Sequence, residues 1–202
     1  MSNTGQSCNA PTRMLVPASR HDEALEIAKS AADKNVVGDP QAEGTMIGPL
    51  VSDVQFNKVQ DLIAKGQEEG ATLVTGGTGR PEHLNRGYYV KPTVFGHVTN
   101  DMTIAQEEIF GPVLSIISYD DLDQAVDIAN DIVYGLEPYV TGSDQDTMAD
   151  VARRLRADQI PLNYAGGGPD APFGGYKQSG NGREKAEWGF EDYLEVKAIL
   201  GS

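Results

Sequence analysis

The stretch Val113-Leu114-Ser115-Ile116-Ile117 follows a Gly111-Pro112 turn and precedes a helical pattern from Asp121 to about Asn130, and this order decides the fold class. A short apolar run of this kind predicts a buried strand, and the spacing behind it predicts a helix. Strands alternating with helices predict an α/β domain with a mainly parallel, twisted sheet and helices on both faces. Further strands are expected over residues 13–17, 72–75, 88–95 (broken by Pro92), 136–141 and 159–163, and further helices over 19–31, from 56 to Gly66 or Gly70, and over 144–156.

The end of the chain has a different composition. Residues 164–182 are rich in glycine and contain Pro169 and Pro172, which predicts a long irregular loop that is either functional or flexible. Residues 184–188 predict one or two helical turns. Residues 193–199 alternate like a half-exposed strand, and such a strand needs a partner.

Composition excludes several classes of function. The chain of 202 residues has 16 basic and 30 acidic residues and a formal net charge of −14, so it lacks the basic field that binding of a nucleic-acid backbone requires. No stretch approaches the roughly 18 apolar residues that span a bilayer, and the first residues do not resemble a signal peptide. The single cysteine cannot form an internal disulfide. We therefore expect a soluble cytoplasmic protein with no nucleic-acid or membrane partner.

The only cysteine, Cys8, lies in Gly5-Gln6-Ser7-Cys8 just before the first expected strand. A loop there can present a nucleophile, but most lone cysteines are small buried hydrophobes, and the local sequence favours that second interpretation. The three histidines, His21, His83 and His97, are interpreted as ordinary surface residues, and a Cys-His dyad would arise only through folding. We find no metal-ligand spacing, nucleophile elbow, Walker A loop or dinucleotide-binding glycine turn.

Two other segments allow both a functional and a structural interpretation. Two carboxylates lie beside an aromatic ring in the segment Gln106-Glu107-Glu108-Ile109-Phe110-Gly111-Pro112. The segment either binds hydroxyl groups or is a solvated acidic pair, and the local sequence alone favours the solvated pair. The glycine-rich segment from Pro172 to Glu184 is either a lid or a plain connection. Its aromatic residues favour the wall of a site.

Six motifs follow one another along almost the whole chain: Gly5-Gln6-Ser7-Cys8, Glu107-Glu108-Ile109-Phe110-Gly111-Pro112, Tyr134-Gly135-Leu136, Pro172-Phe173-Gly174-Gly175-Tyr176-Lys177-Gln178-Ser179-Gly180, Gly182-Arg183-Glu184 and Tyr193-Leu194-Glu195-Val196-Lys197. Taken in this order, they resemble the C-terminal catalytic half of an NAD(P)-dependent aldehyde dehydrogenase. The resemblance implies a catalytic-type domain over residues 1–190. It also implies that residues 191–202 form a C-terminal strand leading into the oligomerisation arm of the family.

The resemblance also implies roles for individual residues. Cys8 aligns with the nucleophile that attacks the aldehyde carbon before hydride leaves to the nicotinamide and water hydrolyses the thioester, and its backbone N–H would supply half of an oxyanion hole. Glu108 aligns with the carboxylate that holds the nicotinamide-side ribose, and Phe110 with the ring beside the nicotinamide. Asn163 and Phe173 align with residues at the substrate end of the tunnel.

The 202 residues lack the family's cofactor-binding half, with its glycine turn, the Asn that completes the oxyanion hole and the Glu that activates water. We therefore expect an excised, engineered or remnant domain that binds NAD or NADP only weakly and is inactive or partly active alone. One alternative is a non-catalytic monomeric scaffold or folding unit derived from the domain. Another is a module that recovers function by binding a separate cofactor domain.

The two late strands depart from the family, which prefers small or apolar residues there. Glu137, Pro138, Asp158 and Pro161 occupy these strands, and proline cannot donate to a strand ladder. Charges and prolines of this kind resemble edge protection against strand-to-strand association. We therefore expect a monomer, with random drift in a non-functional remnant as the alternative explanation.

Overall fold

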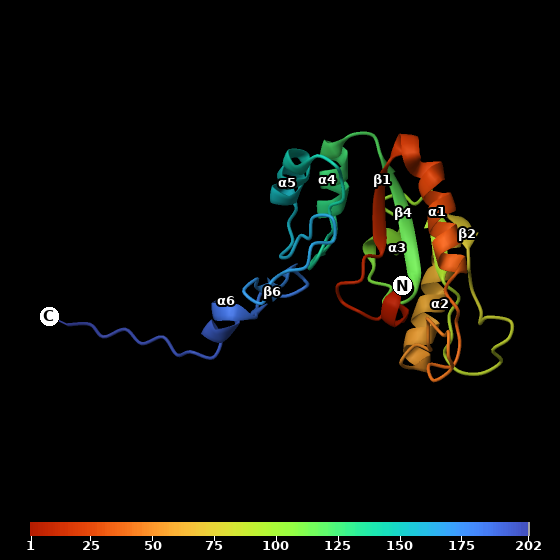
Figure 1. Ribbon diagram of the computed structural model, residues 1–202, viewed down its shortest axis with the longest axis horizontal. Coiled ribbons are helices and arrows are strands. Elements are labelled where there is room, and N and C mark those ends of the chain that lie inside the picture. Colours follow the sequence, from red (N-terminus) through yellow and green to blue (C-terminus); the bar gives the residue numbers. More distant parts are fainter. Residues whose placement is uncertain (202) are drawn as a thin grey trace. The chain divides into compact units, whose positions relative to one another are not determined.

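A computed structural model describes residues 1–201, which form two compact units. The first unit covers Met1–Asp131, and the second begins at Ile132. Figure 1 shows the helices and strands of each unit. Within residues 1–201, none of the helices has both the length and the apolar character needed to cross a bilayer.

The first unit is built on a four-stranded sheet in the order β1-β4-β3-β2. Its strands are β1 (Arg13–Pro17), β2 (Thr72–Thr75), β3 (Thr93–Gly96) and β4 (Val113–Tyr119). β4 runs parallel to both neighbours, with Met14 opposite Ile116 and Val94 opposite Leu114. β2 pairs antiparallel with β3, so the sheet is mainly parallel with one antiparallel edge.

Helices cover both faces of this sheet, because side chains along β4 point alternately to the two sides. Ile116 packs with Ala24 and Ala32 of α1, whereas Val113 and Ile117 pack on the other side with residues of α2 and α3. Ser52 and Asp121 cap α2 and α4 by accepting hydrogen bonds from the N–H groups three residues on. The helices are α1 (His21–Asp33), α2 (Asp53–Glu68), α3 (Thr103–Gln106) and α4 (Leu122–Asn130). The expected α/β class, with a mainly parallel sheet and helices on both faces, is therefore confirmed.

The second unit has shorter elements. β5 pairs antiparallel with β7, and β6 pairs antiparallel with β8. Its elements are β5 (Tyr134–Gly135), α5 (Gln145–Arg154), β6 (Phe173–Gly174), β7 (Tyr176–Lys177), β8 (Arg183–Glu184) and α6 (Ala186–Glu191).

Several expected elements are shorter than the sequence pattern predicts. The strand expected over 88–95 begins only at Thr93, after Pro92, and the late strands are reduced to a single bridge between Val140 and Leu162. Residues 193–199 form no strand, and Tyr193, Val196 and Ile199 are exposed. Proline explains the shortening of the strand expected over 88–95 and of the two late strands, because it cannot donate to a strand ladder. Residues 193–199 form no strand because no other described strand pairs with them.

Two further expectations are wrong in detail. The helix expected from residue 19 begins only at His21, because a short 3-10 turn over Ala18–Arg20 precedes it and its N-cap is Arg20. His21 is not a surface residue, since it is only 6% exposed.

Candidate active site

The loop that carries Cys8 has an unusual backbone. Asn3, Thr4 and Gly5 follow one another with φ of 50°, 58° and 72°, a left-handed run that residues with side chains rarely adopt. The Asn3 amide stabilises the run by donating to the Gln6 carbonyl at 2.6 Å. The chain is thereby bent sharply just before Cys8.

Side chains of the same loop anchor it to the segment that precedes α2. The Thr4 hydroxyl donates to the Gly48 carbonyl at 3.2 Å, and the Gln6 side-chain oxygen accepts from the Val51 N–H at 2.9 Å. Thr4 is buried, although its side chain is polar, because this hydrogen bond satisfies the hydroxyl. The loop before Cys8 is therefore held by long-range contacts and does not depend on local turns alone.

Cys8 itself is exposed, within a turn in which the Ala10 N–H donates to the Ser7 carbonyl at 3.0 Å. Among residues 1–201, neither the Cys8 thiol nor the Cys8 N–H has a hydrogen-bond partner. The buried-hydrophobe interpretation of Cys8 is thus wrong. An exposed thiol beside a free N–H can both attack an electrophilic carbon and donate to the oxygen on that carbon.

The segment with Glu108 and Phe110 lies against this loop. A Cβ on Gly5 would be 2.0 Å from the Gly111 carbonyl oxygen, so the two backbones are in direct contact. Phe110 is half-buried with φ of 56°, and the Gln55 amide of α2 holds this bend by donating to the carbonyls of Ile109 and Phe110, each at 2.9 Å.

The Glu108 side chain is exposed, and within residues 1–201 its carboxylate has no hydrogen-bond or ion-pair partner. A free carboxylate can accept hydrogen bonds from the hydroxyl groups of a ligand. The fold thus brings the Cys8 and Glu108 motifs, which are about 100 residues apart in the sequence, into one region of the first unit.

Asn163 and Phe173 belong to the second unit. Asn163, with φ of 49°, uses its amide to bind both backbone groups of Gly142, accepting at 3.0 Å and donating at 2.9 Å. One amide hydrogen and one oxygen lone pair of Asn163 remain for a ligand. Phe173 is half-buried in β6, and the Lys185 ammonium lies 5.3 Å from the centre of its ring.

A buried ion pair that the sequence analysis missed organises the glycine-rich segment. Asp158 Oδ1 accepts from Arg183 Nε at 2.9 Å, and the Asp158 side chain is 8% exposed. Arg183 also donates to the Gly175 carbonyl at 2.9 Å. Asp158 was interpreted as edge protection, but it serves an internal contact. Its departure from the small residue expected at that position was the only sequence signal of this role.

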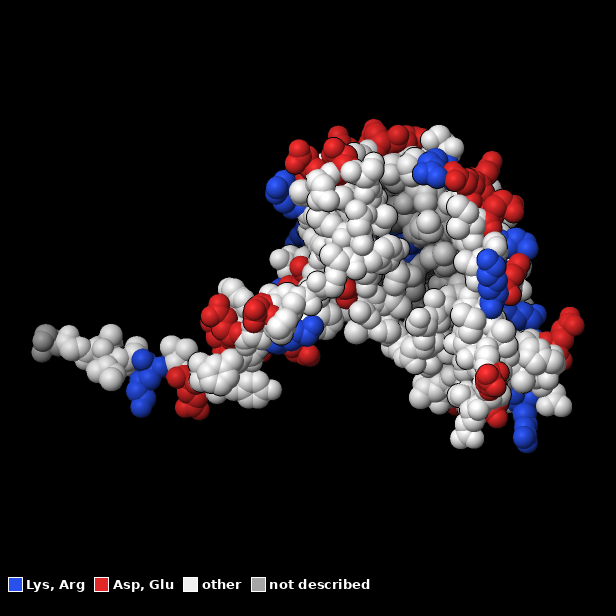
Figure 2. Space-filling view, in the orientation of Figure 1, with Lys and Arg blue, Asp and Glu red and all other residues white. Residues whose placement is uncertain are grey.

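Glu137, the other charged departure, lies beside Tyr139, whose hydroxyl donates to the Glu137 carboxylate at 3.1 Å. Burial and the neighbouring carboxylate raise the pKa of Tyr139 to about 12. Figure 2 shows acidic side chains among scattered basic ones on its visible face, and the described residues on that face form no continuous basic patch.

The fold and the cysteine loop define an α/β domain with a single exposed thiol at the amino-terminal edge of a mainly parallel sheet. The chain belongs to the aldehyde dehydrogenase family, which it matches over residues 1–199. A putative aldehyde dehydrogenase of Staphylococcus haemolyticus is 55% identical over 201 residues, which are 100% of this chain and 42% of that protein.

Solved structures agree with this assignment. A cysteine-to-alanine variant of aldehyde dehydrogenase C from Pseudomonas syringae, in complex with NAD+ and octanal, is 54% identical with a TM-score of 0.94, over 97% of this chain and 40% of that chain. The Mycobacterium tuberculosis aldehyde dehydrogenase complexed with NAD+ is 46% identical with a TM-score of 0.93, over 98% and 41% of the two chains. The chain therefore spans about two fifths of the length of these relatives.

Proposed function

We propose that this chain is the cysteine-bearing catalytic portion of an NAD(P)-dependent aldehyde dehydrogenase, with Cys8 as the nucleophile. The observation that carries the proposal is the exposed Cys8 thiol with a free N–H, on a loop fixed against the Glu108–Phe110 segment. The family supplies the reaction class, which is oxidation of an aldehyde to a carboxylic acid. Residues 1–190 would form the catalytic domain, and residues 191–202 would form a strand once a partner is present.

The chain's own residues account for the first half of this reaction. The Cys8 thiolate forms a bond to the aldehyde carbon, and the carbonyl π electrons move to the oxygen. The Cys8 N–H donates to that oxygen, which stabilises the charge developing there. The product is the alkoxide form of a thiohemiacetal on Cys8, in which the carbon still carries the hydrogen that is lost on oxidation.

Glu108 and Phe110 fit a nicotinamide cofactor, because one offers a free carboxylate for ribose hydroxyls and the other a half-buried ring for the nicotinamide. The cofactor, when bound, supplies the hydride acceptor. NAD is favoured by relatives that were solved with NAD+, although NADP remains the second candidate. Neither is expected to bind tightly to these residues alone.

Asn163 and Phe173 would bind the substrate. The half-buried ring of Phe173 suits an apolar aldehyde chain, and the spare amide hydrogen of Asn163 suits a hydrogen-bond acceptor of the substrate. The octanal bound by the Pseudomonas syringae relative supports a substrate with an apolar tail. The protein would act in the cytoplasm.

Because the 202 residues contain no general base of the family pattern, we expect slow or absent turnover unless a separate cofactor-binding domain is added. Reduced-cofactor formation should be followed with NAD or NADP and aldehydes including octanal, with Cys8→Ser as the control. The rate of Cys8 alkylation should be measured in parallel, because Cys8 is the only thiol and the labelling is unambiguous.

Turnover that disappears in Cys8→Ser supports the proposal. The proposal is also supported if added octanal slows the alkylation of Cys8 in a saturable way without turnover. That result indicates a nucleophile in an incomplete site. Alkylation that octanal leaves unchanged, in a folded protein without turnover, contradicts the proposal.

The second candidate is a non-catalytic monomeric scaffold. Pro138 and Pro161 support it, because only the bridge between Val140 and Leu162 remains where two strands were expected. Sedimentation distinguishes a monomer from a dimer. If Pro161→Val forms a dimer more strongly than the original chain, these prolines oppose strand pairing.

A further inference from the structure

The carboxyl-terminal ends of β1 and β3 bring together two histidines that are far apart in the sequence. His21 begins α1 shortly after β1, and His97 directly follows β3. Because β1, β4 and β3 are mutually parallel, these ends share one edge of the sheet, where α/β proteins commonly bind ligands. The Cys8 loop precedes β1, so it lies at the opposite edge.

The two rings are held in contact by the backbone. Their centroids are 4.5 Å apart, and the His97 N–H donates to His21 Nε2 at 3.3 Å. His97 has φ of 52°, a left-handed conformation that is uncommon for residues with side chains and that concentrates at functional sites. His21 is 6% exposed, so its ring has little freedom to move away.

Asp22 adds a carboxylate to the pair. Its Oδ1 lies 3.9 Å from His21 Nδ1, which is too long for a hydrogen bond and a few tenths of an ångström longer than the roughly 3.4 Å between two ligand atoms of a tetrahedral Zn²⁺. One donor atom from each of His21, Asp22 and His97 lies within 4.8 Å of the others. The adjacent cation, Arg20, is already paired with Glu23 at 2.8 Å.

We propose that His21, Asp22 and His97 form a binding site for a zinc-class divalent cation at the carboxyl-terminal edge of the sheet. Two imidazoles and one carboxylate are the ligand types that Zn²⁺ prefers, and Mg²⁺, which requires oxygen ligands, would not compete. Water completes the coordination. The exposed side chains of Asp22 and His97 close the remaining gap by rotating towards the buried His21.

Binding changes one hydrogen bond in a predictable way. A neutral imidazole has one nitrogen that accepts and one that carries the proton, and His21 accepts through Nε2 without metal. A cation on Nδ1 occupies the lone pair there, so the ring proton moves to Nε2 and opposes the His97 N–H. The His97 amide therefore loses its acceptor when the metal binds.

The test is a Zn²⁺ titration of the full chain by calorimetry, with NMR observation of the His97 amide. It should be done in a Cys8→Ser background, because an exposed thiol also binds zinc. We expect one site in that background. His97→Asn keeps a residue that tolerates left-handed φ, and it should raise the zinc dissociation constant by at least about tenfold, the effect of losing even an outer-shell partner. Asp22→Asn should also weaken binding.

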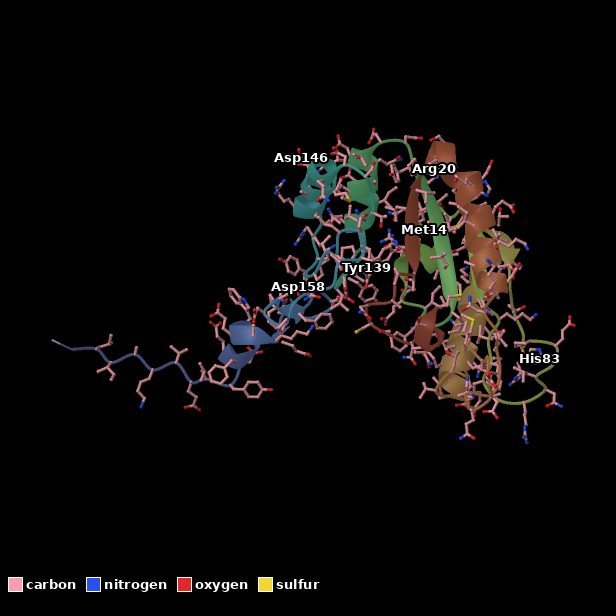
Figure 3. All side chains as sticks on the ribbon, viewed as in Figure 1. Met14, Arg20, His83, Tyr139, Asp146 and Asp158 are labelled. Atoms are coloured by element: carbon pink, nitrogen blue, oxygen red, sulfur yellow. The ribbon has the colours of Figure 1, made fainter. Side chains whose placement is uncertain are left out.

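His83→Asn is the matched control. His83 lies in the loop between β2 and β3, and Figure 3 shows it well away from Arg20, the residue before His21. It should leave the zinc affinity and the His97 amide shift unchanged. Absence of zinc binding, equal weakening in His83→Asn, or binding that leaves the His97 amide unshifted would each overturn the proposal.

Discussion

Asp158 and Arg183 form an ion pair inside the second unit, with 2.9 Å between Asp158 Oδ1 and Arg183 Nε. Because Arg183 also pairs with Gly174 between β8 and β6 and donates to the Gly175 carbonyl, the pair fixes the backbone that directly follows Phe173. The adjacent Gln159 donates to the Pro172 carbonyl. Two consecutive residues therefore hold both ends of the short hairpin that carries the proposed substrate-binding ring.

Replacing Asp158 should destabilise this hairpin. Asp158→Ala leaves the Arg183 guanidinium without its carboxylate, and since that side chain is 24% exposed, we expect a loss of about 1–3 kcal/mol. Urea unfolding measures the loss, and hydrogen exchange of residues 173–184 locates it. The exposed Asp170 offers a control, and Asp170→Ala should change neither quantity. Equal effects of the two substitutions would contradict the role given to the ion pair.

Gly5→Ala should displace the Cys8 loop. The new Cβ would meet the Gly111 carbonyl oxygen at 2.0 Å, and φ of 72° adds the left-handed strain of about 1–2 kcal/mol. Gly70→Ala separates the two effects, because Gly70 has φ of 97° and no atom within 4 Å of an added Cβ. Gly5→Ala should therefore lower the unfolding free energy more than Gly70→Ala. It alone should change the alkylation rate of Cys8.

The strands and helices of the first unit were predictable because their signals are local. The apolar run of β4 and the period of α1 need no knowledge of distant residues. The antiparallel direction of β2 was not predictable, since the residues Thr72–Thr75 do not indicate which strand they pair with or in which direction. The alternation of residues 193–199 predicts a strand, but within residues 1–201 this segment pairs with no other strand.

The candidate site was predictable only in part. The motifs around Cys8 and Glu108 are recognisable as segments, but their contact depends on the close approach of Gly5 to Gly111. Ligand-spacing patterns could not find the pair of His21 and His97, because parallel strand ends bring together residues separated by most of the first unit.

Gln55 should control the position of Phe110. Its amide donates to the carbonyls of Ile109 and Phe110, and Gln55→Met removes both bonds at nearly constant volume. We expect faster hydrogen exchange of residues 107–112 and a loss of about 1–2 kcal/mol. Gln41→Met, at an exposed position, provides the control. Unchanged exchange in Gln55→Met would show that α2 does not hold this bend.

Acidification should weaken the junction between α2 and α3 through Glu69. The hydrogen bond from the Thr103 hydroxyl at 2.6 Å, with a second from the Thr103 N–H at 2.7 Å, holds the pKa of Glu69 below its ordinary value. A lowered folded-state pKa means that the unfolded chain binds the proton more readily. This contribution is therefore complete above the ordinary carboxyl range and is lost as the pH falls through the folded-state pKa.

Glu69→Gln should make the unfolding free energy depend less on pH in the acid range, because the amide does not titrate. Thr103→Val should reduce this dependence as well, since the hydroxyl is the larger cause of the shift. Urea unfolding at a series of pH values between neutrality and the acid transition measures both effects. Glu43→Gln, at an exposed position, should retain the original slope. A slope that neither Glu69→Gln nor Thr103→Val alters would assign the acid sensitivity to other carboxylates.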